Sequence, residues 1–516
     1  MPAGKNAKKA SRVVKSASPK RGIRSGKQTP SVINGVSKKW AKLLAEDRMP
    51  EQIPGQDRKK NISTKIVDHR TQHERDFDRV VFCAPVRRLK DKTQVFPLDM
   101  HDGVRTRLTH SMEVSNLARS MGVAVAAKLD GLKDVRDAAR NVPSLLAAIS
   151  LTHDLGNPPF GHQGEEAIRE WVRTNQESIR AQSIEGPFDE KLLRDFLFFE
   201  GNAQGFRILS RLQFQDHKSG LRLTASTLRA FMKYPWGSDE IRSGAPVKKF
   251  GYFQSEKSIF DWCSGLTGCT SERHPLSYLM EVCDDIAYSV LDVEDGVKKE
   301  LVSVPELASF LGSHPKYKDD ERVLDLLKQY REDGQWLSEI FVPARGGGRV
   351  PLSGKEARES LVDMVRSYAI GLMVSDAIAC FLENCAGGTL DRLDGGIAKE
   401  FNSSALMSGF KEFARLRIYK HPDVLKAELE GHRIIPALLG AYWKAICAHC
   451  RGDATKQDEY VLSLMSPNYL RVFWQSADLG LPVWYRQLQL VCDQVCGMTD
   501  SYAVRTYQDL RGLDIL

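Results

Sequence analysis

The chain has 516 residues, of which 42% are apolar and 27% are charged, a composition typical of soluble globular proteins. Its longest apolar runs, such as SLLAAISL at residues 144–151, are shorter than the roughly 18 residues that a membrane helix needs. No apolar segment follows the first basic residues, so we expect neither a membrane span nor a secretory signal. Ten cysteines without regular spacing indicate reduced thiols and a cytoplasmic protein.

Positive charge is concentrated at the N-terminus. Residues 1–40 contain eleven Lys and Arg and no Asp or Glu, so the remainder has a formal net charge of −3, against +8 for the whole chain. Residues 1–36 also have almost no large apolar side chains, which is typical of a disordered, solvated tail. Two alternatives are an arm that contacts nucleic acid phosphates and an organelle transit peptide.

Helical periodicity dominates from about Lys38 onward. Two segments, residues 111–129 and 274–297, have apolar residues at helical spacing: Met112, Leu117, Met121 and Val125 in the first, and Leu279, Val282, Ile286 and Val290 in the second. A third segment begins with Pro143, which suits a first helical turn, and ends at Gly156 before two prolines. Residues 251–260 and 346–354 are expected to form short loops or hairpins at most. The sequence therefore predicts an all-α fold.

Histidines and carboxylates accompany these helices. His153 and Asp154 are adjacent at the end of an apolar helix, His110 stands at the start of the helix over 111–129, and Asp284 lies inside the helix over 274–297. Two imidazoles and two carboxylates suit a divalent ion that takes N and O ligands and keeps positions open for water. Such an ion would also compensate the charges of THDLGNPPFGHQGEE, residues 152–166, because burying unpaired charge is costly.

Two other groups compete as metal sites. A second His–Asp pair, His101 and Asp102, has His69 or His73 upstream, but no apolar helix precedes it, and we expect an exposed loop there. The CAHC string has zinc-like spacing, with two later cysteines as conceivable partners, but its helix is apolar and cysteine is a common small core residue. We therefore interpret these four cysteines as core residues: Cys447, Cys450, Cys492 and Cys496.

Several strings resemble the HD-domain deoxynucleoside triphosphate triphosphohydrolases, specifically the bacterial dGTPase group. They are RRLKDKTQVFPLD, VRTRLTHSMEV, HDLGNPPFGHQGE, FEGNAQGFRIL, KYPW and YLMEVCDDIAYSVLDVEDG, in the family's order between Val81 and Gly296, with RLRIYKH at residues 415–421. The resemblance is weak over 300–400 and 430–516 and absent from the tail. It implies an HD-domain helical fold with additional C-terminal helices: a tail at 1–36, a catalytic core at 37–300, and a helical part at 301–516 that completes the active site and makes oligomer contacts.

The resemblance also implies roles for individual residues. The metal ligands are His110, His153, Asp154 and Asp284. Asp284 is preferred to its neighbour Asp285 because it shares one helix face with Tyr288 and Asp292. His162 is the implied proton-transfer group, with Glu165 one turn later to orient its imidazole. The implied phosphate-binding residues are Arg107, Asn202, Lys233, Tyr234, Lys249 (or its neighbour Lys248), Tyr288 and Arg417. Gln94 and Asp292 would hold the sugar 3′-hydroxyl, and His421 is a further candidate near the nucleotide.

The reaction implied by the resemblance is metal-dependent hydrolysis of a dNTP, with dGTP preferred, to the deoxynucleoside and inorganic triphosphate. The implied cofactor is Mg²⁺ or Mn²⁺, and the implied partners are the dNTP, further copies of the chain and single-stranded DNA. Two alternatives remain open: an HD-type phosphohydrolase acting on other nucleotides, and a nucleotide- or nucleic-acid-binding regulator without turnover. An HD-type phosphohydrolase acting on other nucleotides would not explain the KTQVFPL, GNAQG and KYP strings. A regulator without turnover would not explain why the metal-ligand set is complete and His162 is also present.

Overall fold

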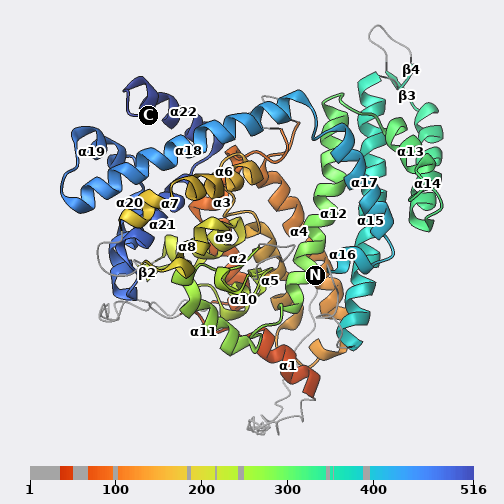
Figure 1. The fold of residues 1–516 in the computed structure, drawn as a ribbon. Helices are drawn as coiled ribbons and strands as arrows, with labels where there is room; N and C mark the ends of the chain where they lie inside the picture. The colour runs from red at the N-terminus through yellow and green to blue at the C-terminus, as the bar shows by residue number, and fades with distance from the viewer. Residues whose placement is uncertain are drawn as a thin grey trace, which may run out of the picture.

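The computed structural model describes residues 35–49, 68–96, 103–182, 188–215, 218–241, 249–343, 349–352, 354–387 and 396–516. The prediction of an all-α fold is confirmed, since helices form almost all of the regular structure in these ranges (Figure 1). The helices before residue 300 are α1 (Gly35–Leu43), α2 (Gln72–Val81), α3 (Ala84–Arg88), α4 (Arg107–Lys128), α5 (Ala138–Thr152), α6 (Gly161–Thr174), α7 (Gln176–Ala181), α8 (Glu190–Leu197), α9 (Gly201–Arg207), α10 (Ala225–Phe231), α11 (Lys257–Thr267) and α12 (Pro275–Lys298).

The later helices are α13 (Val304–Ser313), α14 (Glu321–Ser338), α15 (Gly354–Gly387), α16 (Ile397–Glu400), α17 (Ser404–Arg417), α18 (Pro422–Arg451), α19 (Lys456–Ser463), α20 (Pro467–Gln475), α21 (Val483–Cys496) and α22 (Asp500–Gly512). Two short antiparallel hairpins pair β1 (Phe214–Gln215) with β2 (Lys218–Ser219) and β3 (Phe341–Pro343) with β4 (Arg349–Pro351). Residues 1–34, which make up nearly all of the predicted tail, and the His101–Asp102 pair lie outside the described ranges. The division of the chain at residue 300 stays a prediction.

Helices α4 and α5 pack closely in the N-terminal half. A capping box begins α4, in which the side chains of Thr106 and Thr109 each accept the other's backbone N–H. The prediction that Pro143 lies in the first turn of its helix is wrong: α5 begins at Ala138 and Pro143 lies inside it. Proline there removes one helical hydrogen bond. Gly122 of α4 faces it, and a Cβ on Gly122 would lie only 2.9 Å from Pro143 Cα, so the absence of a side chain at Gly122 allows the two backbones to approach this closely.

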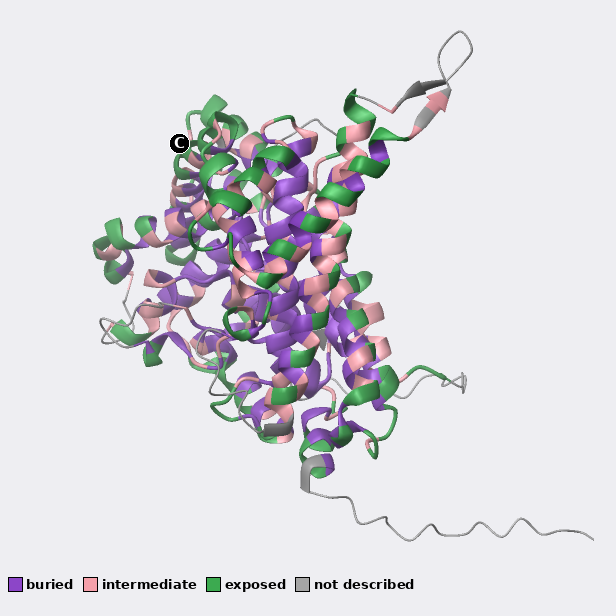
Figure 2. Cartoon of the chain, turned by 90° about the vertical axis from the view of Figure 1, so that its right-hand side faces the viewer, coloured by how far each residue is buried: buried purple, intermediate pink, exposed green. Residues whose placement is uncertain are grey.

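Helix α12 lies between α4 and α5 on one side and α15 and α17 on the other (Figure 1). It begins with His274 as N-cap and Pro275 in the first turn. The predicted apolar stripe is confirmed as a buried face: Leu279, Val282, Ile286 and Val290. In α4, by contrast, Met112 is 56% exposed, and the buried face is centred on Val114, Ala118 and Met121. Buried residues are concentrated in these central helices (Figure 2).

The expected loop segments are partly helical. Residues 349–351 form strand β4 of a hairpin, as expected. Residues 251–260 do not form a loop throughout, because α11 begins at Lys257 and buries Ile259 and Phe260 with Cys263 on one face. Of the four cysteines interpreted as core residues, three are buried, and Cys450 is exposed on α18. The described residues hold no cysteine metal cluster.

One helix, α15, is long and apolar enough to cross a membrane by length and composition, over residues 354–385. Uninterrupted apolar runs do not reveal it because Asp376 lies inside it. The Asp376 carboxylate accepts two hydrogen bonds from Arg322 of α14, both 2.8 Å long, and one from Ser403. A mostly buried core helix passes the same test, but only 33% of the apolar window of α15 is buried, where α15 packs against α12 and α14.

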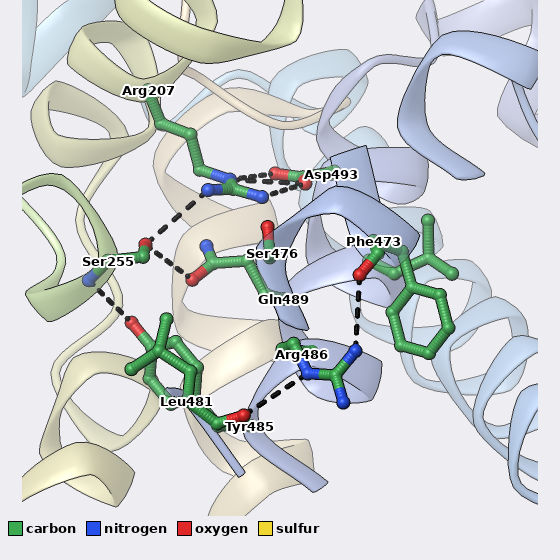
Figure 3. Close-up of a pocket in the computed structure, with 10 residues that line it drawn as sticks. Arg207, Ser255, Phe473, Ser476, Leu481, Tyr485, Arg486, Gln489 and Asp493 are labelled. Carbon is green, nitrogen blue, oxygen red and sulfur yellow. Dashed lines mark hydrogen bonds and ion pairs between the residues drawn. The ribbon is translucent and has the colours of Figure 1, made fainter. Parts of the chain in front are cut away.

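A buried ion cluster joins the C-terminal helices to the N-terminal half, and Figure 3 shows its Arg207–Asp493 pair. Arg207, at the end of α9, donates to Asp493 of α21 over 2.8 Å and to Glu256 over 2.8 Å. Gln204 also donates to Asp493, over 2.9 Å, and Arg211 donates to Glu256. All five side chains are buried, so the attraction between them acts with little screening by water. The cluster fixes α21 against α9, although almost 300 residues separate them.

We expect Asp493→Ala to destabilise the fold by about 3 kcal/mol or more, because it leaves excess positive charge buried on Arg207 and Arg211. The measurement is the free energy of unfolding from urea denaturation. The matched control is Asp261→Ala, which removes the exposed ion pair with Lys257 and should cost less than about 1 kcal/mol. Equal stability of the two variants would mean that the buried cluster does not hold α21 in place.

Candidate active site

Three helices bring the predicted ligands together. Arg107 and His110 lie in the first turn of α4, His153 and Asp154 directly follow α5, and Asp284 lies in the middle of α12. The contacts of α12 with α4 and α5 therefore decide whether these side chains meet. They meet around the carboxylate of Asp284.

The Asp284 carboxylate is the centre of the cluster. Its Oδ1 lies 3.2 Å from His110 Nε2 and 3.3 Å from His153 Nε2, and its Oδ2 lies 3.3 Å from Lys233 Nζ. Burial by itself would raise the pKa of Asp284, but His153 and Lys233 hold it well below its ordinary value. One ligand atom each from His110, His153 and Asp284 lies within 4.8 Å of the others. This spacing allows one ion to reach all three.

The tautomer of His153 fits a metal ligand. Its Nδ1 lies 2.7 Å from the backbone oxygen of Ser150, a contact that requires the proton on Nδ1 and leaves a lone pair on Nε2. That Nε2 is buried and has no hydrogen-bond partner among the described residues, although it faces Asp284. An orphaned nitrogen acceptor beside a second imidazole and a carboxylate matches the donor set of a divalent N/O site.

Asp154 lies beside this group, outside the set of atoms within 4.8 Å. Its Oδ2 is 3.6 Å from His153 Nε2 and accepts a hydrogen bond of 2.5 Å from Arg107. Its Oδ1 accepts from Asn157 over 2.8 Å. Burial raises the pKa of Asp154, but the Arg107 charge more than offsets this and holds the pKa below its ordinary value. The carboxylate is thus ionised and fixed in orientation at the edge of the cluster.

Asp285, the competitor of Asp284, points to another partner. Its Oδ1 accepts a hydrogen bond of 2.7 Å from Lys411 of α17. Lys411 also lies over the ring of Tyr288, with Nζ 4.6 Å from the ring centre. The preference for Asp284 therefore agrees with the geometry, and the physical reason is the rotation of about 100° between neighbouring helix positions.

His162 lies in the first turn of α6, and Glu165 follows it about one turn later. The chain enters this helix through two left-handed residues, Phe160 with φ 62° and Gly161 with φ 60°. His162 Nδ1 lies 3.4 Å from Glu165 Oε2, and this hydrogen bond raises the pKa of His162. The imidazole is 80% exposed, whereas Glu165 is buried. A buried acceptor thus holds one nitrogen of an accessible imidazole and leaves Nε2 free to exchange protons.

The start of α9 donates a hydrogen bond to Glu165 and so helps to fix its carboxylate. The backbone N–H of Gly201 donates to Glu165 Oε1 over 2.9 Å, and Arg169 donates to Oε2 over 3.3 Å. A Cβ on Gly201 would lie 2.6 Å from Glu165 Oε1 and 2.4 Å from the side chain of Asn157. Only glycine allows α9 to approach this closely, which gives the GNAQG string a physical reason.

A cavity of about 520 Å³ opens at this cluster, within the usual size range of small-molecule sites. Seven of the predicted site residues line it: Gln94, Arg107, Asp154, His162, Asp284, Tyr288 and Asp292. Tyr288 and Asp292 follow Asp284 along one face of α12. Burial raises the pKa of Asp292 to about 7, although Tyr419 donates a hydrogen bond of 2.5 Å to it.

Other predicted substrate-binding residues are not among those lining the cavity. Lys233 Nζ forms an ion pair with Asp284 Oδ2. Lys249 Nζ lies 5.7 Å from the ring centre of Tyr234. Asn202 donates to Glu200 over 2.6 Å. Arg417 is exposed at the end of α17. His421 is the N-cap of α18.

Further lining residues were not predicted: Thr93, Val95, Phe160, Gly161, Gln163, Tyr419, Val424 and Glu428. Tyr419 lies inside the RLRIYKH string, two residues after Arg417, so the string did carry a signal for it. Val424 and Glu428 share one face of α18 at i and i+4, but nothing in the sequence indicates that this face covers the cavity.

Comparisons with known proteins agree with this architecture. Residues 107–202 match the HD domain, and residues 400–509 match the phosphohydrolase-associated domain. The chain is 36% identical to a deoxyguanosinetriphosphate triphosphohydrolase-like protein of Listeria innocua, over 92% of this chain and all of that protein. A protein of the same description from Pseudomonas aeruginosa is 31% identical over 92% of this chain and 98% of its own length. The deoxyguanosinetriphosphate triphosphohydrolase of Klebsiella pneumoniae is 28% identical over 86% and 94%.

Fold and site together define an HD-domain phosphohydrolase. More narrowly, the chain belongs to the family of deoxyguanosinetriphosphate triphosphohydrolase-like proteins.

We expect Asp284→Asn to lose a bound divalent ion and Asp285→Asn to retain it. The two carboxylates are neighbours, but only Asp284 faces both imidazoles, and an amide is a much poorer ligand for a hard cation. Elemental analysis after dialysis against Mn²⁺ measures the metal content. Full metal content in Asp284→Asn, or its loss in Asp285→Asn only, would contradict this ligand set.

Proposed function

We propose that this protein hydrolyses a deoxynucleoside triphosphate, with dGTP preferred, to the deoxynucleoside and inorganic triphosphate. The observation that carries the proposal is one cavity shared by the Asp284 cluster, the His162–Glu165 pair and the polar face of α12. Support also comes from the relatives, whose names describe action on deoxyguanosine triphosphate. Water would attack the α-phosphorus, and the 5′-oxygen would leave.

His110, His153 and Asp284, with Asp154 beside them, would hold a Mg²⁺ or Mn²⁺ ion. When bound, that ion would supply positive charge to the α-phosphate and stabilise the negative charge that develops during attack. Arg107 fixes the orientation of Asp154 and brings a guanidinium to the cavity wall. Lys233 lies behind Asp284, where its charge keeps that carboxylate ionised.

His162 would transfer the proton. Glu165 holds its Nδ1, so Nε2 is the atom that takes a proton from the attacking water or gives one to the leaving 5′-oxygen. A group in this role typically contributes about 10²–10⁴-fold in rate. Gln94 and Asp292 would hold the sugar 3′-hydroxyl. Tyr288 and Tyr419 lie beside Asp292, so a sugar held by its 3′-hydroxyl would have little space at C2′. A ribonucleotide, which carries a 2′-hydroxyl there, would bind less well.

In the proposal, further polar and cationic side chains would contact the phosphates: Asn202, Lys233, Tyr234, Lys249, Tyr288 and Arg417. A homo-oligomer, a role of the basic N-terminal segment in binding single-stranded DNA, and a cytoplasmic location also belong to the proposal.

Incubation with each dNTP and each rNTP, with Mg²⁺ or Mn²⁺ and in water enriched in ¹⁸O, tests the reaction. We expect deoxynucleoside and triphosphate in equal amounts, fastest from dGTP and slower from rNTPs. The ¹⁸O label should enter the triphosphate, since attack at phosphorus leaves the 5′-oxygen on the nucleoside. Release of orthophosphate or pyrophosphate would assign the protein to another class of HD phosphohydrolase, and no turnover would favour a nucleotide-binding regulator.

We expect His162→Ala to lower kcat by about 10²-fold or more while metal content and dNTP affinity are kept. Glu165→Gln should have a smaller effect on kcat and should lower the pKa of His162, because the carboxylate that raises it is gone. The limb of the pH–rate profile that His162 controls should then move to lower pH, whether His162 acts as base or as acid.

The control for this experiment is Glu166→Gln, since Glu166 pairs with Arg169 and Arg173 and not with His162. Its pH profile should match that of the unaltered protein. A wild-type kcat in His162→Ala would assign the proton to another group, and loss of metal would make His162 a ligand.

A further inference from the structure

Two segments far apart in the sequence form one rim of the cavity. One contains Thr93 and Gln94, next to the short helix at Leu89–Asp91, and the other is the turn from Asp154 to His162. The first segment is tied to α4, because the backbone N–H of Arg107 donates to Lys92 O over 3.1 Å. In the proposed reaction, the first segment carries the sugar contact and the second carries the proton-transfer group.

Asp500 of α22 bridges these two segments. Its Oδ2 accepts hydrogen bonds from the backbone N–H of Thr93, over 2.8 Å, and from the Thr93 hydroxyl. Its Oδ1 accepts from the backbone N–H of Phe160 over 3.1 Å. The carboxylate is buried and forms no ion pair within the described part of the chain, so three hydrogen-bond donors and the nearby charge of Lys92 compensate its own charge. Each of its oxygens therefore has a separate partner segment.

Lys92 makes a second tie at the same place. Its buried ammonium donates to the backbone oxygen of Asn157 over 2.6 Å and to that of Cys496, the last residue of α21, over 2.8 Å. Asn157 in turn donates to Asp154. The end of α21 and the start of α22 thus hold both the Thr93 segment and the turn that carries Asp154.

The backbone of that turn requires such support. Phe160 has φ 62°, a left-handed conformation that bulky residues rarely adopt and that persists only where the surroundings fix it. The hydrogen bond from its N–H to Asp500 is one such constraint. Gly161 follows in the same conformation, and His162 is the next residue. The direction of His162 therefore depends on how firmly Phe160 is held.

We propose that Asp500 is a positioning residue that couples the sugar-binding segment at Thr93–Gln94 to the turn that carries His162. The inference rests on the proposed function, which gives those two segments their tasks. It assigns the C-terminal helices a part in catalysis: their contribution at this point is the geometry of the cavity rim, with no contact to the reacting atoms.

Asp500→Asn is the direct test. An amide has one acceptor oxygen, so it cannot accept from both Thr93 and Phe160, and its NH₂ group would face a backbone donor. We expect kcat for dGTP to fall about 10–100-fold, since small misplacements of reacting groups have effects of this size. We also expect a smaller preference for dGTP over GTP, with unchanged metal content and faster amide hydrogen exchange at Thr93 and Phe160. The matched control is Asp509→Asn, an exposed position on the same helix.

Thr93→Val provides a second, milder variant, because it removes only the hydroxyl bond to Asp500. It should shift kcat and sugar preference in the same direction by a smaller factor, while Thr93→Ser should restore both. If Asp500→Asn does not fold, the kcat and sugar preference of Thr93→Val test the proposal instead. Wild-type kcat and sugar preference in Asp500→Asn would overturn the proposal, even if thermal stability fell. An unaltered protein that releases no triphosphate would instead reject the proposed function.

Discussion

The carboxylate of Asp284 is the point on which the rest of this structure depends. It is flanked by two imidazoles and an ammonium group, contributed by α4, by the turn after α5 and by the segment after α10. A carboxylate that is largely withdrawn from water and has no partners would be protonated or would destabilise the fold. Helices α4, α5 and α12 therefore have to pack so that these side chains converge. The close α4–α5 contact at Gly122 and Pro143 and the fully apolar stripe of α12 provide that packing.

The C-terminal helices complete the site. The HD domain match ends at residue 202, yet Tyr419, Val424 and Glu428 also line the cavity, and Asp500 holds its rim. The buried cluster of Arg207, Glu256 and Asp493 explains why these helices stay in register with the N-terminal half: any shift would separate desolvated charges. The same α9 that carries Arg207 presents Gly201 to Glu165, so one short helix links the buried cluster to the proton-transfer pair.

Residues within one helix or one turn could be related to each other from the sequence. Asp284, Tyr288 and Asp292 share a face of α12, and His162 lies one turn from Glu165, as their spacing predicted. The position of Pro143 was predicted wrongly, because proline is most common in a first helical turn, whereas α5 begins at Ala138 and continues through Pro143 with the loss of one helical hydrogen bond. The exposure of Met112 could not be predicted either. Periodicity shows which residues share a helix face, but not which other helices cover that face.

The sequence by itself determined the helical fold class, because local periodicity records which residues share a helix face. Short strings that resemble a known family pointed to the family and to the residues that meet at Asp284, although these residues are far apart along the chain. The tertiary structure alone decided which partner each charge takes. Asp285 turns to Lys411, Lys233 lies behind Asp284, and Asp500 reaches Thr93 and Phe160 across 407 and 340 residues. Such pairings follow from how helices pack in three dimensions, and a hydrogen bond between distant segments leaves no periodic pattern in either of them.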